Sequence, residues 1–227
     1  MAVVYVLGAG ASRDIGYPLA SEMGEKLFDY MLASEDTMSR ASAEYSIDRF
    51  GKSTNFEDLI TELIQRTDQL KDSPDSNERA GRMRLGNRLG CMVDYLRLWF
   101  REIHERPADS YADFARNVVQ AGDVIITFNY DDSLERELKR AGKWDVGSGY
   151  GFPLGTSEIS SDVLALKLHG SVNWLVSLFG GAAGGAFLVN PVSSMGNRPV
   201  VHRADLKFLG MKNSKVILMR LEAHFYV

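Results

Sequence analysis

The feature that most constrains the fold is a short apolar run that stops at a glycine-rich loop. The run from Val3 to Leu7 has no polar interruption, which is typical of a fully buried strand in a parallel sheet. The loop that follows reads Gly8-Ala9-Gly10-Ala11-Ser12. Apolar residues then recur at helical spacing from Leu19 to Leu32. A strand, a glycine loop and a helix in this order present backbone N–H groups to a phosphate, so we expect an α/β fold.

The glycine loop alone permits two interpretations. Gly8 and Gly10 allow backbone geometries and a close ligand approach that a Cβ would block, and Ser12 can cap the next helix or contact a phosphate. The third glycine of the usual dinucleotide fingerprint is missing, because Arg13 stands in its place. A tight turn without a ligand therefore remains an alternative to a phosphate site.

Two more apolar runs end in polar residues. The run from Val124 to Thr127 leads to Asn129, and the run from Val163 to Leu168 leads to His169. In open parallel sheets, ligands bind beyond the carboxyl ends of the strands, so these side chains should meet the glycine loop. An amide can hold a ribose hydroxyl or a water, and a histidine can exchange a proton near neutral pH.

Other polar residues suit structural roles. Asp131 and Asp132 precede a helix expected to reach Arg140, so their simplest role is to cap it. The single cysteine, Cys91, lies in an apolar helical stretch and is expected to be a small buried side chain. Structural roles are also expected for the remaining histidines, His104, His202 and His224.

Between the first two strands the chain is mostly helical. Helices are expected from Asn55, from about Arg79 to Glu105, and from Ala108 to Gln120, whereas residues 35–52 look polar and irregular. This predicts a helical insert at about residues 35–120. Beyond about residue 175 the assignment is poor: residues 177–185 form a glycine-rich loop, and 186–189 and 215–219 are weaker strand candidates.

Composition narrows the class of protein. The 227 residues carry a net charge of −4, which argues against a dedicated nucleic-acid or acidic-membrane surface but allows a local basic pocket for a dinucleotide. One cysteine cannot form an internal disulfide or a multi-cysteine zinc site. No apolar stretch reaches the length of a membrane span, so we expect a soluble protein in the cytoplasm.

Three motifs together resemble the sirtuin family, and more closely its bacterial, defence-associated, NAD-hydrolysing branch. The glycine loop is followed by Gly16-Tyr17-Pro18, which matches the family's Gly-x-Pro. Thr127-Phe128-Asn129-Tyr130-Asp131 matches Thr-Gln-Asn-x-Asp in all but the second position. The string Lys167-Leu168-His169-Gly170-Ser171-Val172-Asn173-Trp174 resembles the sirtuin-like domains of antiphage systems.

The resemblance implies a single Rossmann-like, NAD-binding domain over residues 1–227, a parallel sheet with the helical insert between its first two strands. By analogy, Asn129 holds the nicotinamide ribose or the attacking water, and His169 acts as a base without a metal. The NAD-binding residues it implies are Gly8, Ala9, Gly10, Ala11, Ser12, Pro18, Thr127 and Asp131. The expected reaction is hydrolysis of NAD to nicotinamide and ADP-ribose.

Departures from the family favour this hydrolysis. Leu19-Ala20-Ser21 stands where protein deacylases carry Asp-Phe-Arg, and one cysteine cannot supply their four-cysteine zinc module. A sensor that binds NAD or ADP-ribose without turnover is the first alternative, and a deacylase or ADP-ribosyltransferase is the second.

The resemblance also implies regulation. A regulated effector of antiphage defence is expected, with a homo-oligomer or an activating partner protein and no direct contact with nucleic acid or membrane. The chain ends on an apolar run, which fits either a truncated form or a short variant.

Overall fold

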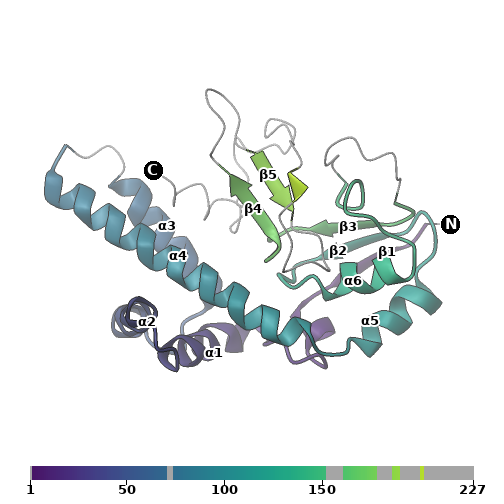
Figure 1. Cartoon of the computed structure of the whole chain (residues 1–227), viewed down its shortest axis with the longest axis horizontal. Coiled ribbons are helices and arrows are strands. Elements are labelled where there is room, and N and C mark those ends of the chain that lie inside the picture. Colours follow the sequence, from purple (N-terminus) through teal and green to yellow (C-terminus); the bar gives the residue numbers. More distant parts are fainter. Residues whose placement is uncertain (1, 71–73, 152–160, 178–185, 190–199, 202–227) are drawn as a thin grey trace. The chain divides into compact units, whose positions relative to one another are not determined.

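The computed structural model describes residues 2–70, 74–151, 161–177, 186–189 and 200–201 (Figure 1). These residues are mixed α/β and fall into two compact units. One unit combines the residues up to Tyr17 with those from Ile103 onward, and the other runs from Pro18 to Glu102. Each unit is described by itself.

The first unit is built on a parallel sheet of three strands. These are β1 (Val4–Leu7), β2 (Val124–Thr127) and β3 (Leu164–Lys167), in the order β1-β2-β3. Val4 pairs with Val124, and Val124 pairs with Leu164, so the strands are aligned without a stagger. This confirms the three strands expected from the apolar runs, and with them an α/β fold containing a parallel sheet.

The two faces of this sheet differ in burial. On one face, Ile125 and Ala165 are fully buried, and the ring of Tyr5 packs edge-on against Phe114 at 5.0 Å. On the other face, Val4 is 60% and Val6 is 64% exposed. The expectation of a fully buried first strand is therefore wrong, because β1 lies at an edge of the strand order and the helical segment packs against its opposite face.

Helices of this unit follow the expected segments. α5 (Asp109–Asp113) continues into the π-helical segment η2 (Phe114–Val118), and α6 (Ser133–Arg140) follows β2. α5 and α6 pack together, as Figure 1 shows beside the sheet. Their buried apolar side chains are Tyr111, Ala115, Leu134 and Leu138.

The second unit is helical. It contains α1 (Ala20–Leu32), α2 (Thr37–Phe50), α3 (Phe56–Gln69) and nearly all of α4 (Ser76–His104). Its fully buried side chains include Leu27, Phe28, Met31, Leu59, Ile60, Leu63, Met92 and Leu96. The unit begins and ends earlier than the insert expected at about residues 35–120, because α1 packs with α2 and α3 whereas α5 packs with α6.

The expectation of irregular structure at residues 35–52 is wrong, because α2 forms there. Asp36 caps its start by accepting hydrogen bonds from the backbone N–H groups of Met38 and Ser39. The buried face of α2 carries small residues, among them Ser42 and Ser46, whose hydroxyls donate to carbonyls one turn earlier. A serine-rich buried face has no apolar periodicity, so the sequence pattern does not reveal this helix.

Three further strands form a separate antiparallel sheet. These are β4 (Trp174–Ser177), β5 (Ala186–Val189) and β6 (Val200–Val201), in the order β4-β5-β6. β5 confirms one of the two weaker strand candidates. The other candidate, at 215–219, His202, His224 and nearly all of the glycine-rich stretch lie outside the described residues.

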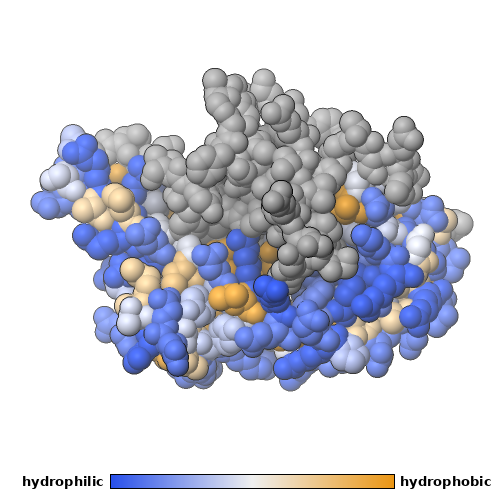
Figure 2. Space-filling view, in the orientation of Figure 1, coloured by the Kyte–Doolittle hydropathy of each residue, from blue (hydrophilic) through white to orange (hydrophobic). Residues whose placement is uncertain are grey.

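The surface of the described residues is mostly hydrophilic in the view of Figure 2. None of the described helices combines the length and the apolar character that a membrane crossing requires.

Cys91 lies half-buried in α4, whereas the sequence predicts a buried side chain, and burial raises the pKa of its thiol. A raised pKa keeps the thiol protonated and unreactive, so the expectation of a structural cysteine agrees with this environment.

Candidate functional site

The ends of the three parallel strands meet at one edge of the sheet. Backbone pairing continues one residue beyond the strands, because Phe128 N–H donates to the Leu7 carbonyl at 3.2 Å and Leu168 N–H donates to the Thr127 carbonyl at 3.0 Å. The glycine loop, Asn129 and His169 therefore leave the sheet at the same edge. This convergence is the central expectation from the sequence, and the backbone confirms it.

Ser12 is the centre of a buried hydrogen-bond cluster. Its hydroxyl donates to Asp131 Oδ2 at 2.7 Å and accepts from Asn129 Nδ2 at 2.9 Å, and Tyr111 OH lies 2.8 Å from it. The side chain is 1% exposed. A hydroxyl has one proton and two lone pairs, so these contacts use its whole capacity. Ser12 Oγ is thus committed to the protein and has no hydrogen-bonding capacity left for a phosphate.

Asn129 is held from several sides. Its backbone N–H donates to Thr127 Oγ1 at 3.1 Å, and its Nδ2 also donates to the Gly8 carbonyl at 3.0 Å. Asn129 is 8% exposed, and its Oδ1 is buried without a hydrogen-bond partner among the described residues. A buried carbonyl oxygen without a partner is unfavourable unless a ligand or water donates to it. The amide therefore presents an acceptor beside the glycine loop.

Asp131 contributes both to the cluster and to the start of α6. Its Oδ1 accepts from Ser133 N–H at 3.1 Å, and its Oδ2 accepts from Ser12. Burial raises the pKa of this carboxyl, partly opposed by the positive charge of Lys167. Asp132 occupies the cap position of α6 but makes no side-chain cap bond, because its carboxylate pairs with His104 Nδ1 at 2.9 Å. The capping role expected for Asp132 is therefore wrong.

A buried ion pair lies beneath the cluster. Lys167 Nζ is 2.8 Å from Glu135 Oε1, with side chains 0% and 1% exposed, and it also donates to the Asp131 carbonyl. Glu135 Oε1 contacts Tyr150 OH at 3.4 Å, and burial raises the pKa of its carboxyl. The sequence interpretation missed this pair. The sequence feature that could have revealed it is a lone charged residue, Lys167, at the end of an apolar strand, since a buried charge needs a partner.

His169 follows β3 at the same sheet edge. The residue is half-buried, and its ring packs against Phe128 at 5.2 Å and Tyr130 at 5.9 Å between ring centres. These aromatic contacts come from the segment that also carries Asn129. The two residues expected to be catalytic are thus positioned by adjacent strands.

The glycine loop itself forms a short 3₁₀ turn, Ala9–Ser12, after Gly8. Neither Gly8 nor Gly10 has a positive φ, and a Cβ at either position would meet no protein atom within 4 Å. The expectation that these glycines supply a backbone geometry that a Cβ would block is therefore wrong. The protein itself would accommodate a Cβ at either position, and a close approach by a ligand stays a prediction.

Gly16 and Pro18 differ from the loop glycines. Gly16 has φ of 111°, and a Cβ there would collide with the Arg106 guanidinium, so its glycine is required by the fold. Pro18 is the first residue of the helical unit, and its part in the site stays a prediction.

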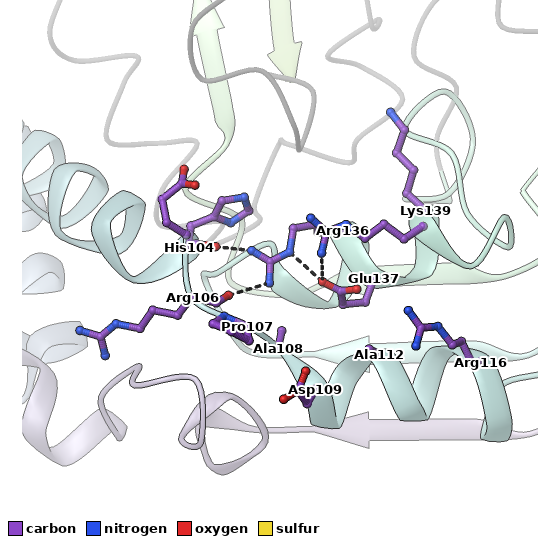
Figure 3. A pocket seen from close by; sticks show the side chains of 12 residues that line it. His104, Arg106, Pro107, Ala108, Asp109, Ala112, Arg116, Arg136, Glu137 and Lys139 are labelled. Carbon is purple, nitrogen blue, oxygen red and sulfur yellow. Dashed lines mark hydrogen bonds and ion pairs between the residues drawn. The ribbon is translucent and has the colours of Figure 1, made fainter.

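A separate cavity of about 630 Å³ lies between α5 and α6 (Figure 3). It is lined largely by charged side chains and contains none of the motif residues. The Arg136 guanidinium there bonds to Glu137 at 2.9 Å and to the carbonyls of His104 and Arg106, and Glu137 also binds Arg140 at 2.8 Å. The two buried charges of its lining, Arg136 and Glu137, are thus paired with each other.

Among the described residues, no group of three or more His, Cys, Asp or Glu side chains could hold a metal ion.

Tyr111, which α5 contributes to the Ser12 cluster, lay outside every sequence motif. Nothing in the local sequence distinguished it from an ordinary core tyrosine.

No protein-family model matches the chain, and a comparison with curated proteins finds no match.

Proposed function

We propose that this chain is an NAD glycohydrolase with a Rossmann-like, sirtuin-like NAD-binding domain. The observation that carries the proposal is the buried Asn129 Oδ1, an acceptor without a protein partner among the described residues, beside the open space at Gly8 and Gly10. A dinucleotide has phosphates suited to the loop and ribose hydroxyls that donate to such an acceptor. The three sirtuin-like motifs supply the identity of that dinucleotide.

The reaction requires little chemistry from the protein. The bond between C1′ of the ribose and the nicotinamide nitrogen breaks, and nicotinamide leaves as a neutral molecule with the bonding electron pair. The ribose becomes oxocarbenium-like, water forms the new C1′–O bond, and the water loses a proton. Asn129 Oδ1 would orient the ribose hydroxyl or the water, and His169 would accept the proton.

The proposal extends to a regulated effector of antiphage defence that binds NAD in the cytoplasm and acts as a homo-oligomer or with an activating partner protein. Its support is the resemblance of residues 167–174 to the sirtuin-like domains of antiphage systems. Uncontrolled loss of NAD would harm the cell, so an activity of this kind needs a restraint. Measuring cellular NAD before and during phage infection, with and without the intact chain, tests this extension.

The direct test is to incubate the purified chain with NAD and quantify nicotinamide and ADP-ribose. Asn129→Ala and His169→Ala should each lower the rate by about 100-fold or more, the scale of a lost catalytic acid–base group. Asn117→Ala is a matched control, because Asn117 is exposed on η2. The assay is repeated at high protein concentration, where an oligomer would form.

Each outcome separates the proposal from its alternatives. Tight binding of NAD or ADP-ribose in calorimetry without turnover would support a sensor in place of an enzyme. Release of nicotinamide only with an acylated peptide would support a deacylase. Unchanged activity in His169→Ala would remove His169 from the mechanism.

A further inference from the structure

Tyr111 reaches the candidate site from α5, which lies outside all the sirtuin-like motifs. Its side chain is 4% exposed, and its hydroxyl is 2.8 Å from Ser12 Oγ and 3.4 Å from Asn129 Nδ2. A buried phenol in contact with both Ser12 and Asn129 is placed to influence how the Asn129 amide is held.

The directions of these hydrogen bonds follow from the count of protons. The single Ser12 hydroxyl proton goes to Asp131 Oδ2, so Ser12 Oγ can only accept from its other neighbours. Tyr111 OH must therefore donate to Ser12 Oγ, and its own lone pair faces Asn129 Nδ2. Burial raises the pKa of Tyr111 well above its ordinary value, so the phenol keeps its proton throughout the physiological range.

These directions select one of the two orientations of the Asn129 amide. As observed, Nδ2 faces three oxygen atoms, those of the Gly8 carbonyl, Ser12 and Tyr111. In the flipped orientation, Oδ1 would face the Gly8 carbonyl oxygen, which has no proton, and the hydroxyls of Ser12 and Tyr111, whose protons are already donated to Asp131 and to Ser12. The flipped amide is thus disfavoured, and Oδ1 remains the amide atom without a protein partner among the described residues.

We propose that Tyr111 is a positioning residue that, together with Ser12, locks the Asn129 amide with Oδ1 toward the substrate. The consequence is specificity for a ligand atom that donates a hydrogen bond, such as a ribose hydroxyl or a water, over one that only accepts. This inference rests on the proposed function for its kinetic readout, although the orientation of the amide is measurable without it.

The first experiment observes the amide directly. The side-chain ¹H–¹⁵N signals of Asn129 are assigned by their loss in Asn129→Ala and then followed in Tyr111→Phe. We expect Tyr111→Phe to shift both signals. Tyr30→Phe is the control, since it removes a hydrogen-bonded phenol hydroxyl, bonded to Glu102 Oε1 at 2.5 Å, in the helical unit, and it should leave them unchanged.

The second experiment measures kinetics on NAD. Tyr111→Phe should lower kcat about tenfold and change KM less than about twofold, because the ligand still binds while its reacting atoms are less well held. In an Asn129→Ala background the same substitution should have no further effect, since Tyr111 acts through that amide. Ser12→Ala should likewise lower kcat with little change in KM, and it serves as the second variant if Tyr111→Phe does not fold.

Three results would overturn the inference: Asn129 signals that do not move in Tyr111→Phe, a rise in KM with kcat unchanged, or additive losses in the double variant. If the wild-type chain does not hydrolyse NAD, the proposed function fails, but the spectroscopic experiment still decides whether Tyr111 orients the amide. The two failures are therefore distinguishable.

Discussion

The Ser12 hydroxyl donates to the Asp131 carboxylate at 2.7 Å, although 119 residues separate them along the chain. This bond joins the loop after β1 to the segment between β2 and α6. Because the bond lies beside Asn129 Nδ2 and is shielded from water, it links the glycine loop to the residue proposed to act on the ribose. The stability of this site and its chemistry are thus coupled through Ser12.

Ser12→Ala should destabilise the folded chain. The substitution leaves Asp131 Oδ2 and one N–H of Asn129 with fewer partners in a buried place, which typically costs about 1–3 kcal/mol of unfolding free energy. Urea denaturation followed by circular dichroism measures it. Ser21→Ala, at an exposed position in α1, is the control and should change the free energy by less than about 0.5 kcal/mol.

Lys167→Met should destabilise the chain more strongly, by about 3–5 kcal/mol, because it leaves the Glu135 carboxylate buried without its cation. The loss should shrink as the pH falls, since protonation of Glu135 removes the uncompensated charge. Thermal unfolding at several pH values checks both statements.

The double variant Lys167→Met, Glu135→Leu tests the cause of that loss. Replacing both charges removes the unpaired carboxylate, so the double variant should recover most of the stability. A double variant as unstable as Lys167→Met alone would show that packing around Lys167, and not the buried charge, is responsible.

The His104–Asp132 pair should make stability depend on pH. The hydrogen bond to Asp132 raises the pKa of His104 above its ordinary value, opposed by burial and by Arg136. The stabilisation is therefore fully present below the ordinary histidine pKa of about 6.5 and is lost as the pH rises through the raised value.

Denaturant unfolding between pH 5.5 and 8.5 measures this dependence in the wild type and in Asp132→Asn. Other buried carboxyls, such as Asp131 and Glu135, titrate in both proteins, so the difference between the two curves isolates the pair. The difference should diminish toward high pH. A constant difference would mean that the protonation state of His104 does not change between these pH values.

Two helical glycines should respond to alanine in opposite ways. In α1, a Cβ at Gly24 would lie 2.5 Å from the Thr54 carbonyl oxygen, so Gly24→Ala should cost about 1–3 kcal/mol through overpacking. In α4, a Cβ at Gly86 would meet nothing within 4 Å, so Gly86→Ala should gain about 0.5–1 kcal/mol from helix propensity. Melting temperatures of the two variants, measured together, decide both.

Much of the fold could be predicted from local patterns. The apolar runs identified β1, β2 and β3, and the apolar spacing identified α1, α3 and α4, because these elements bury residues at a regular period. The sequence pattern did not predict α2, because its buried face is built largely from serines whose hydroxyls bond within the helix. The exposure of Val6 was not predicted either, because an apolar run has the same sequence pattern in an edge strand as in a central strand.

The candidate site also combines features that the sequence predicts with features that only the tertiary structure shows. The sequence by itself determined that the glycine loop, Asn129 and His169 follow strands and meet at one sheet edge, since parallel strands end on the same side. Only the tertiary structure decided the partners of Ser12, because Tyr111 and Asp131 lie 99 and 119 residues away from it along the chain. It also decided which atom of the Asn129 amide is left without a protein partner among the described residues. Hydrogen-bond direction depends on every neighbour in three dimensions, and no local pattern contains that information.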